Sequence, residues 1–463
     1  MPFSKKQRDL THGPLLPKII TFTLPLIATA VLQLLFNTAD TMVVGRWGGE
    51  TPEARQAALA AVGSCGALTN LIVGLFMGLS VGAGVCVAHD MGAKRYDGVS
   101  KTVHTSVLAS LICGVAVTVF GIVMARPLLI LMKSPPDVLD QAVRYMRAYF
   151  CGMTANMLYN YCASILRSMG DTTRPLAFLS IAGVANVLLN LVMVIGFHQG
   201  ALGVGVATAT SQWISCILIV LYMMRMDAPC KLEPKKLRIS KKYLKKIISI
   251  GLPAGVQGTL FAISNVIIQS SINGFGTVAV AGNTAASNVD SYVYASQNAL
   301  YHTVLTFVGQ NMGAGKLDRV KKSILYSSLC VVVVGLVLGV SAFVFGRPLL
   351  SIFAPGAPDV IEAGIVRLGL VGLPYFMCGL MEVGSGTLRG FGKSTLSMII
   401  SLIGACAFRL LYIYTIFAAD PVPKVLYYSY PISWFLTALT LFIFVFIELH
   451  RMTRKSTASL PAV

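Results

Sequence analysis

The sequence is poor in charge and above all poor in acid. Only 12% of its 463 residues are charged, and 18 acidic side chains stand against 37 lysines and arginines. Soluble domains average about 25% charged residues, so this composition excludes an ordinary soluble protein. Because 55% of the residues are apolar, the chain is predicted to be an integral membrane protein.

The sequence also lacks the residue patterns of common metal, disulfide and catalytic sites. Its ten cysteines include no Cys-x-x-Cys pair and its histidines form no cluster at metal-ligand spacing, so we expect free thiols and no cofactor. The segment from Gly386 to Ser394 is one residue too long for a P-loop, and no zinc-binding helix motif occurs. We therefore expect no enzyme activity.

What the sequence does contain is an internal duplication. Asp90-Met91-Gly92-Ala93 returns as Asn311-Met312-Gly313-Ala314, a shift of 221 positions, and Arg126-Pro127-Leu128-Leu129 returns as Arg347-Pro348-Leu349-Leu350 at the same shift. A near-constant offset over half the chain indicates two copies of one structural unit. Such duplication is a common plan for membrane transporters.

Apolar runs of bilayer-spanning length occur in both halves of the chain. A span needs about 20 residues, and the apolar runs accommodate twelve spans, six in each half. The predicted fold class is an all-α integral membrane protein with two six-helix lobes related by the duplication. We divide the chain into an N-terminal lobe (1–228), a basic linker (229–246), a C-terminal lobe (247–450) and a tail (451–463).

Lysine and arginine gather in the loops of one side of these spans. This asymmetry predicts a multi-pass protein of the plasma membrane with both termini and the tail in the cytoplasm. Topology and anionic lipid explain the net charge of +19 better than nucleic acid does, and we expect a monomer. The basic linker is either a solvated connector or a site for lipid head groups.

The first predicted span carries polar residues on one helical face. Gln33, Asn37 and Asp40 are spaced four and three apart, and Asp40 lies roughly 9 Å inside the outer boundary. For the two amides, a functional role and a structural role in hydrogen bonds between helices are the two alternatives. For Asp40 we expect function, because a carboxylate takes up a proton or a cation. Further along, Asn186, Asn190 and Thr208 offer neutral oxygens to a desolvated cation such as sodium.

The second half carries a longer polar stripe. It lines one face of a single predicted helix and consists of Asn283, Ser287, Asp290, Tyr294, Gln297 and Tyr301. We expect this face to line water or an organic cation, since aromatic rings beside an acid attract cations, and the alternative is a buried structural network. Glu382 and Arg409, single charges in consecutive helices, are expected to form an ion pair, with Glu382 also able to exchange protons.

Three segments together resemble the MATE (multidrug and toxic compound extrusion) family of transporters. They are the loop Gln310–Ala314 with its copy in the first half, the turn Leu166–Asp171, and Asn37–Asp40 in the first span. The resemblance implies two lobes in a V around a central cleft, and export of organic, often cationic, compounds against inward movement of sodium or protons. It also implies, for the DinF-like type, a coupling site formed by Asp40, Asn186, Thr208 and Tyr145.

One position departs from the family pattern, because Asn190 stands where an aspartate is common. We therefore interpret the chain as a secondary antiporter with alternating access, coupled to H⁺ or Na⁺ at Asp40, Asn186, Asn190, Thr208 and Tyr145. Its predicted substrate cavity consists of Gln33, Asn37, Asp290, Tyr294, Gln297, Tyr301, Glu382 and Arg409. The alternative is a flippase of lipid-linked oligosaccharides or lipids, which needs a strongly basic cavity.

Overall fold

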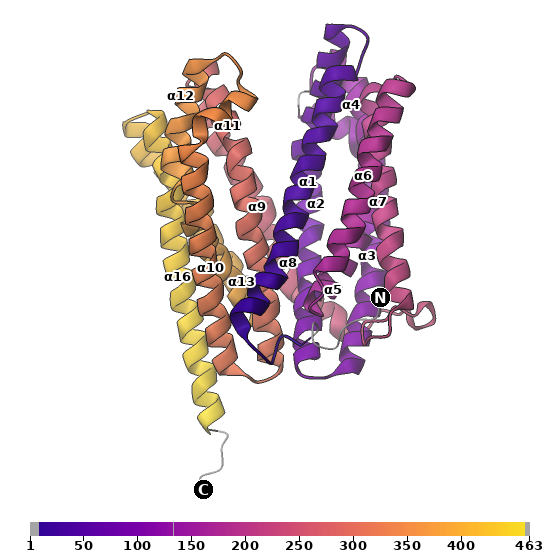
Figure 1. The fold of residues 1–463 in the computed structure, drawn as a ribbon, viewed down its shortest axis with the longest axis vertical. Helices are drawn as coiled ribbons and strands as arrows, with labels where there is room; N and C mark the ends of the chain where they lie inside the picture. The colour runs from indigo at the N-terminus through magenta and orange to yellow at the C-terminus, as the bar shows by residue number, and fades with distance from the viewer. Residues whose placement is uncertain (1–8, 133, 459–463) are drawn as a thin grey trace. The chain divides into compact units, whose positions relative to one another are not determined.

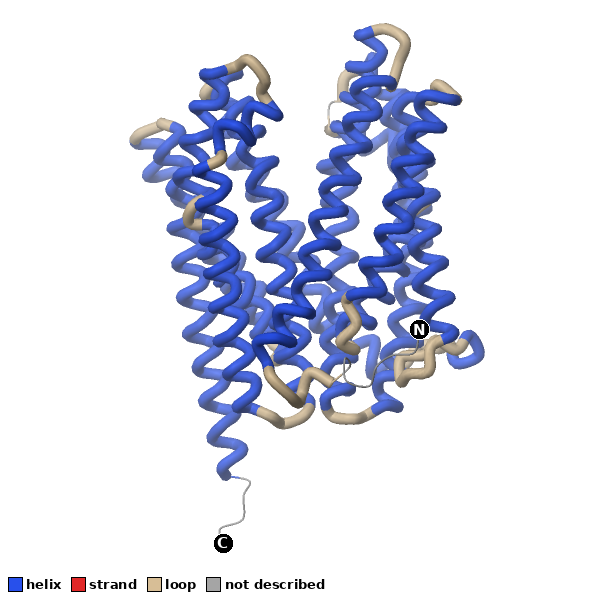
Figure 2. Tube along the Cα trace, viewed as in Figure 1, coloured by secondary structure: helices blue, strands red, loops and turns tan. Residues whose placement is uncertain are grey.

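The structure is a computed structural model that describes residues 9–132 and 134–458, and these residues are largely helical (Figures 1 and 2). The first half contains α1 (Leu15–Trp47), α2 (Pro52–Gly92), α3 (Tyr96–Leu131), α4 (Pro136–Cys151), α5 (Met153–Ser168), α6 (Thr173–Leu191), η1 (Val192–Gly196) and α7 (Gly200–Arg225). After η2 (Pro234–Lys236), the second half contains α8 (Lys241–Asn273), α9 (Thr277–Gly313), α10 (Leu317–Val344), α11 (Gly346–Phe353), α12 (Pro358–Arg367), η3 (Leu368–Gly372), α13 (Tyr375–Gly390), α14 (Ser394–Ser401), η4 (Leu402–Ala407), α15 (Phe408–Tyr412), η5 (Ile413–Phe417) and α16 (Pro423–Ala458). The end of the predicted tail, residues 459–463, lies outside the described residues.

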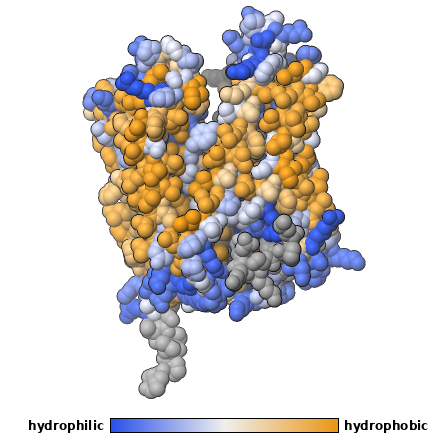
Figure 3. Space-filling model, viewed as in Figure 1, coloured by the Kyte–Doolittle hydropathy of each residue, from blue (hydrophilic) through white to orange (hydrophobic). Residues whose placement is uncertain are grey.

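These elements make twelve segments, six on each side of the linker. Within the described ranges, nine helices are long and apolar enough to cross a bilayer, and the bent pair of α12–η3 with α13 makes a tenth. The other two segments, α4 with α5 and the polar α9, complete the count. On the face that Figure 3 shows, apolar side chains cover the middle of the helices and hydrophilic ones their ends. The predicted all-α, twelve-helix fold is confirmed.

The chain packs into two compact units whose boundaries pass through α1 and α8. Unit 1 contains Ala28–Met91 and Arg95–Gly255, and unit 2 contains Asp9–Ile27, Gly92–Lys94 and the chain from Val256 onward. The breaks in α1 and α8 come two residues after Pro25 and Pro253, which occupy matching places in the two halves. The lobe boundaries drawn from the sequence follow chain order and stay a prediction.

Glycines explain why the first half of α8 belongs to unit 1. A Cβ added at Gly251 of α8 would lie 2.6 Å from the Cα of Leu79 in α2. A Cβ added at Gly78 or at Gly255 would lie 2.1 Å from a backbone atom of the facing helix. Small residues let two membrane helices approach until their backbones touch, which maximises van der Waals contact where lipid offers no hydrophobic driving force. The α2–α8 contact within unit 1 is therefore set by glycine.

The segment before α1 is attached to the repeated loop motif of the second half, within unit 2. Leu10 donates its backbone N–H to Gln310 at 3.3 Å, and Lys316 and Arg319 donate to the carbonyl oxygens of Thr11 and Gly13, each at 3.0 Å. Of the two copies of the repeated loop motif, the one in the second half thus binds the N-terminal segment.

Candidate functional site

The first candidate site surrounds Asp40, which three helices of unit 1 hold in place. Asn190 of α6 donates to one carboxylate oxygen of Asp40 at 2.5 Å, and Thr208 of α7 donates to the other at 3.4 Å. Asn186, one turn before Asn190, accepts from Asn190 at 3.3 Å and donates to Thr208 at 3.5 Å. The four predicted coupling residues on α1, α6 and α7 therefore form one hydrogen-bonded cluster.

This cluster contains one negative charge and no positive one. Asp40 forms no ion pair with any described residue, and its two partners are neutral. The side-chain oxygen of Asn190 is fully buried and has no hydrogen-bond partner among the described residues. Buried polar atoms are rarely left unpaired, so a lone acceptor beside a carboxylate suits a proton or a small cation.

Three other residues predicted near Asp40 are placed differently. Tyr145 of α4 is buried in the core of unit 1, where its ring lies 6.1 Å from that of Tyr149, and no hydrogen bond joins it to Asp40. Gln33 and Asn37 are exposed, and their side chains form no hydrogen bond within the described part of the chain. The alternative that these amides join helices is therefore not what the structure contains.

The polar stripe of α9 in unit 2 divides into three environments. Its upstream part, Asn283 and Asp290, is buried against Arg367 at the end of α12. Arg367 donates twice to one oxygen of Asp290, at 3.1 and 3.2 Å, and once to Asn283 at 2.5 Å. The side chains of Asp290 and Arg367 are only 4% and 9% exposed. Asp290 therefore has a buried cationic partner of its own.

The downstream part of the stripe meets a second buried arginine. Arg389 of α13 donates to the Tyr301 hydroxyl at 2.5 Å and to Gln257 of α8 at 2.8 Å. Gln297 is fully buried, and neither atom of its amide has a partner among the described residues. For Tyr301 the structure matches the alternative of a buried polar network, whereas Gln297 is buried outside that network.

Tyr294, between these two parts, lines a cavity of about 350 Å³ in unit 2. Phe261, Tyr375 and Trp434 add aromatic walls, and Glu382 and Arg409 line the same cavity. Both charged residues are buried, at 8% and 7% exposure. Of the predicted substrate-cavity residues, the structure thus brings Tyr294, Glu382 and Arg409 together around one space, and this cavity does not include Asp290, Gln297 or Tyr301.

The expected ion pair between Glu382 and Arg409 is wrong. No carboxylate of a described residue lies within 4.0 Å of Arg409. Its Nε donates to Ser433 at 2.8 Å, and its guanidinium lies 4.5 Å from the ring of Tyr430 and 5.8 Å from that of Trp434. Ring faces attract cations, so two rings on α16 replace the carboxylate that we expected.

Sequence reasoning missed the two arginines that pair with α9. Arg367 stands at the edge of an apolar run, at the end of α12, and Arg389 lies in the last turn of α13. A signal was present for Arg389, because Leu388-Arg389 repeats Leu166-Arg167 of the first half. No pattern in the sequence indicates that Arg367 turns toward Asp290.

Comparisons with known proteins agree with this architecture. The model of the MatE family matches residues 25–192 and 253–415, one segment in each half. The chain is 27% identical to the probable multidrug resistance protein YoeA of Bacillus subtilis, over 82% of each chain. It is 23% identical to the probable multidrug resistance protein NorM of Thermotoga maritima, over 85% of this chain and 84% of that protein.

Solved structures share the fold. The outward-facing structure of a multidrug resistance MATE family transporter of the MOP superfamily has a TM-score of 0.89 at 20% identity, covering 98% of this chain and 100% of that one. A MOP superfamily transporter from Pyrococcus furiosus has a TM-score of 0.90 with the same identity and coverage. With the family model matched over most of both halves and the twelve helices in place, the chain belongs to the MatE family of membrane transporters.

Proposed function

We propose that this protein exports small organic compounds across the plasma membrane in exchange for H⁺ or Na⁺, by alternating access. The observation that carries this proposal is the environment of Asp40. Its carboxylate is held by an amide and a hydroxyl, lies beside an unpartnered amide oxygen, and has no cationic partner among the described residues. An ionisable group inside a membrane helix is costly, so one without a permanent partner marks an ion pathway.

The replacement of a second carboxylate by Asn190 sets the stoichiometry of this site. One carboxylate becomes neutral when it takes up one H⁺ or one Na⁺, and the amide and hydroxyl oxygens of Asn186, Asn190 and Thr208 are neutral in both states. Neutralising Asp40 removes the charge that orders α1 against α6 and α7. The ion thereby shifts the balance between two packings of these helices, and a substrate that prefers one packing competes with it.

The cavity lined by Tyr294, Glu382 and Arg409 supports an organic, amphipathic substrate. Aromatic side chains form much of its wall, and it offers one buried charge of each sign rather than the excess of positive charge that a carrier of lipid-linked phosphates needs. A cationic or amphoteric aromatic compound fits these walls better than a lipid pyrophosphate. The antiporter is therefore preferred to the flippase.

The test is gradient-driven efflux from liposomes that contain the purified protein and are loaded with the fluorescent cation ethidium. A sodium gradient alone and a pH step alone are applied in separate experiments. We expect one of the two to drive export by the native protein, and Asp40→Asn to abolish that export while the thermal unfolding midpoint stays within a few degrees. Asp137→Asn, which neutralises an exposed acid of the same unit, is the control and retains export. Native rates in Asp40→Asn would refute the coupling role.

A further inference from the structure

The linker between α7 and α8 is fixed against α3 rather than solvated along its length. Cys230 and Leu232 are buried, at 0% and 4% exposure. The backbone N–H of Glu233 donates to Nε2 of His104 at 3.0 Å, and the backbone N–H of Ser240 donates to the Thr105 hydroxyl at 3.1 Å. Hydrogen bonds near both ends thus hold residues 233–240 in one position on the start of α3.

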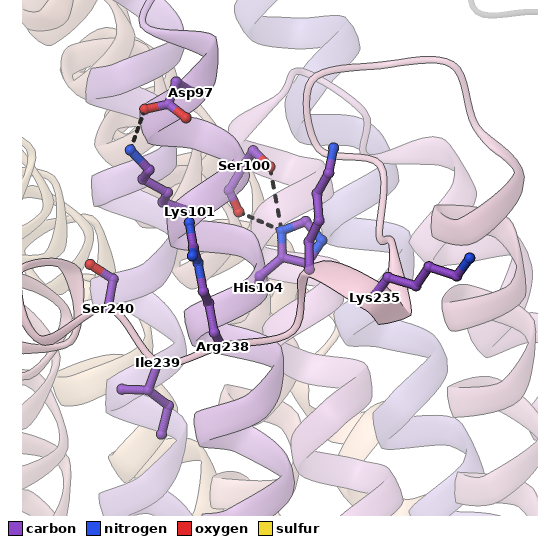
Figure 4. A pocket seen from close by; sticks show the side chains of 9 residues that line it. Asp97, Ser100, Lys101, His104, Lys235, Arg238, Ile239 and Ser240 are labelled. Atoms are coloured by element: carbon purple, nitrogen blue, oxygen red, sulfur yellow. Dashed lines mark hydrogen bonds and ion pairs between the residues drawn. The ribbon is translucent and has the colours of Figure 1, made fainter.

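A cavity of about 620 Å³ lies between this stretch of linker and the first turns of α3 (Figure 4). Four basic residues line it, with a single acid among the lining residues, and the charged set is Asp97, Lys101, Lys235, Lys236 and Arg238. All of these residues belong to unit 1. We name this space the linker cavity.

Two of the four cations of the linker cavity are neutralised locally and two are not. Lys101 pairs with Asp97 at 2.5 Å (Figure 4), and Lys236 pairs with Glu233 at 2.9 Å. Lys235 and Arg238 form no ion pair with any described residue, although the fixed backbone on either side keeps them at the cavity. Their side chains extend in different directions from the linker (Figure 4), so each offers a separate positive charge to an anion.

His104 adds no third charge to this set. Its Nδ1 lies 2.7 Å from the carbonyl oxygen of Ser100 and so donates, while its Nε2 accepts from the N–H of Glu233. A ring that donates at one nitrogen and accepts at the other is the neutral tautomer. The role of His104 is to fix the linker, and recognition of an anion is left to Lys235 and Arg238.

We propose that the linker cavity binds the phosphoryl head group of an anionic membrane lipid. A guanidinium matches phosphate by paired hydrogen bonds, and an ammonium attracts it as a point charge. Ile239, the residue after Arg238, lines the same cavity and is 41% exposed, so an apolar surface adjoins the cations. A ligand with a phosphate and an apolar chain can contact both the cations and the apolar surface, whereas free phosphate can contact only the cations. This site is distinct from the proposed transport function and stands without it.

The experiment measures lipid binding to the purified protein by native mass spectrometry and by the shift in thermal unfolding midpoint. Dioleoyl phosphatidylglycerol, dioleoyl phosphatidylcholine and inorganic phosphate are added in separate arms. We expect only phosphatidylglycerol to bind and to raise the midpoint. The variant Lys235→Gln/Arg238→Gln should bind phosphatidylglycerol about 25-fold more weakly, from roughly fivefold for each basic residue near an anionic surface.

Two further variants separate a specific site from general attraction. Lys322→Gln/Lys393→Gln removes two exposed lysines that line none of the cavities described above, so it lowers the net charge equally and should bind as the native protein does. Ile239→Ser should weaken phosphatidylglycerol binding through the lost apolar contact. Equal binding of phosphatidylcholine, full affinity for inorganic phosphate alone, or equal losses in the two double variants would each overturn the proposal.

Discussion

The buried ion pair of Asp290 and Arg367 supports a prediction about the stability of unit 2. The change is Arg367→Met, which keeps a long apolar stem and removes the charge. Arg367 supplies both hydrogen bonds to one oxygen of Asp290, and the other oxygen is buried with no partner in the described chain. The substitution therefore leaves a buried carboxylate without compensation, which costs about 3–5 kcal/mol. Asn283 also loses its donor, which adds about 1–3 kcal/mol.

The assay is thermal unfolding of the detergent-purified protein, and we expect the midpoint of Arg367→Met to fall by several degrees. The double variant Arg367→Met/Asp290→Leu removes both charges. It should therefore regain the stability lost in Arg367→Met, except for the part that comes from the lost donor to Asn283. Arg347→Met is the matched control, because Arg347 pairs with Glu362 at 2.9 Å with both side chains more than half exposed. Such a surface pair contributes about 0–1 kcal/mol. An unchanged midpoint for Arg367→Met, or a midpoint of the double variant below that of the single one, would refute the reasoning.

Two other predictions concern helix packing and the N-terminal segment. Gly251→Ala should destabilise the protein by about 1–3 kcal/mol, because the added Cβ meets the backbone of α2. The control is Gly258→Ala on the same helix, whose Cβ meets nothing within 4 Å, so this variant should be neutral or stabilising. Thermal unfolding measures both. Burial raises the pKa of Asp9, but hydrogen bonds from Thr11 and His12 outweigh it and lower the pKa from 3.8 to about 2. The contribution of Asp9 to docking of residues 9–13 is thus present above about pH 4 and lost between about pH 4 and 2. Rate-corrected hydrogen exchange of residues 10–13 should show protection falling over this range, and Asp9→Asn should remove the dependence.

The cluster at Asp40 could be predicted from the sequence because its members follow local rules. Asn186 and Asn190 are one helical turn apart, so they share a face whatever surrounds the helix, and both donate within the cluster. That this face turns toward Asp40, 150 positions earlier, came from the family resemblance rather than from spacing. No sequence pattern indicated that the side-chain oxygen of Asn190 has no hydrogen-bond partner among the described residues, and only the structure shows it.

The partners of the second-half charges could not be predicted in the same way. Spacing placed Asn283, Asp290, Tyr294 and Tyr301 on one face of α9, and that face exists. Its neighbours come from α12 and α13, 77 to 88 positions later, and their rotation decides which arginine meets which acid. Opposite charges in consecutive helices suggested Glu382 with Arg409, yet Arg409 turns to Ser433 and the rings of α16.

The sequence by itself determined that this is a membrane protein of twelve helices in two related halves, because bilayer thickness sets helix length and apolar composition directly. It also determined that Asp40 is an isolated acid in an apolar span. Only the tertiary structure decided which charges are neutralised and which are left available. Pairing depends on the rotation of packed helices over a few ångströms, and in a low-dielectric interior that distance decides whether a charge is compensated or open to a ligand.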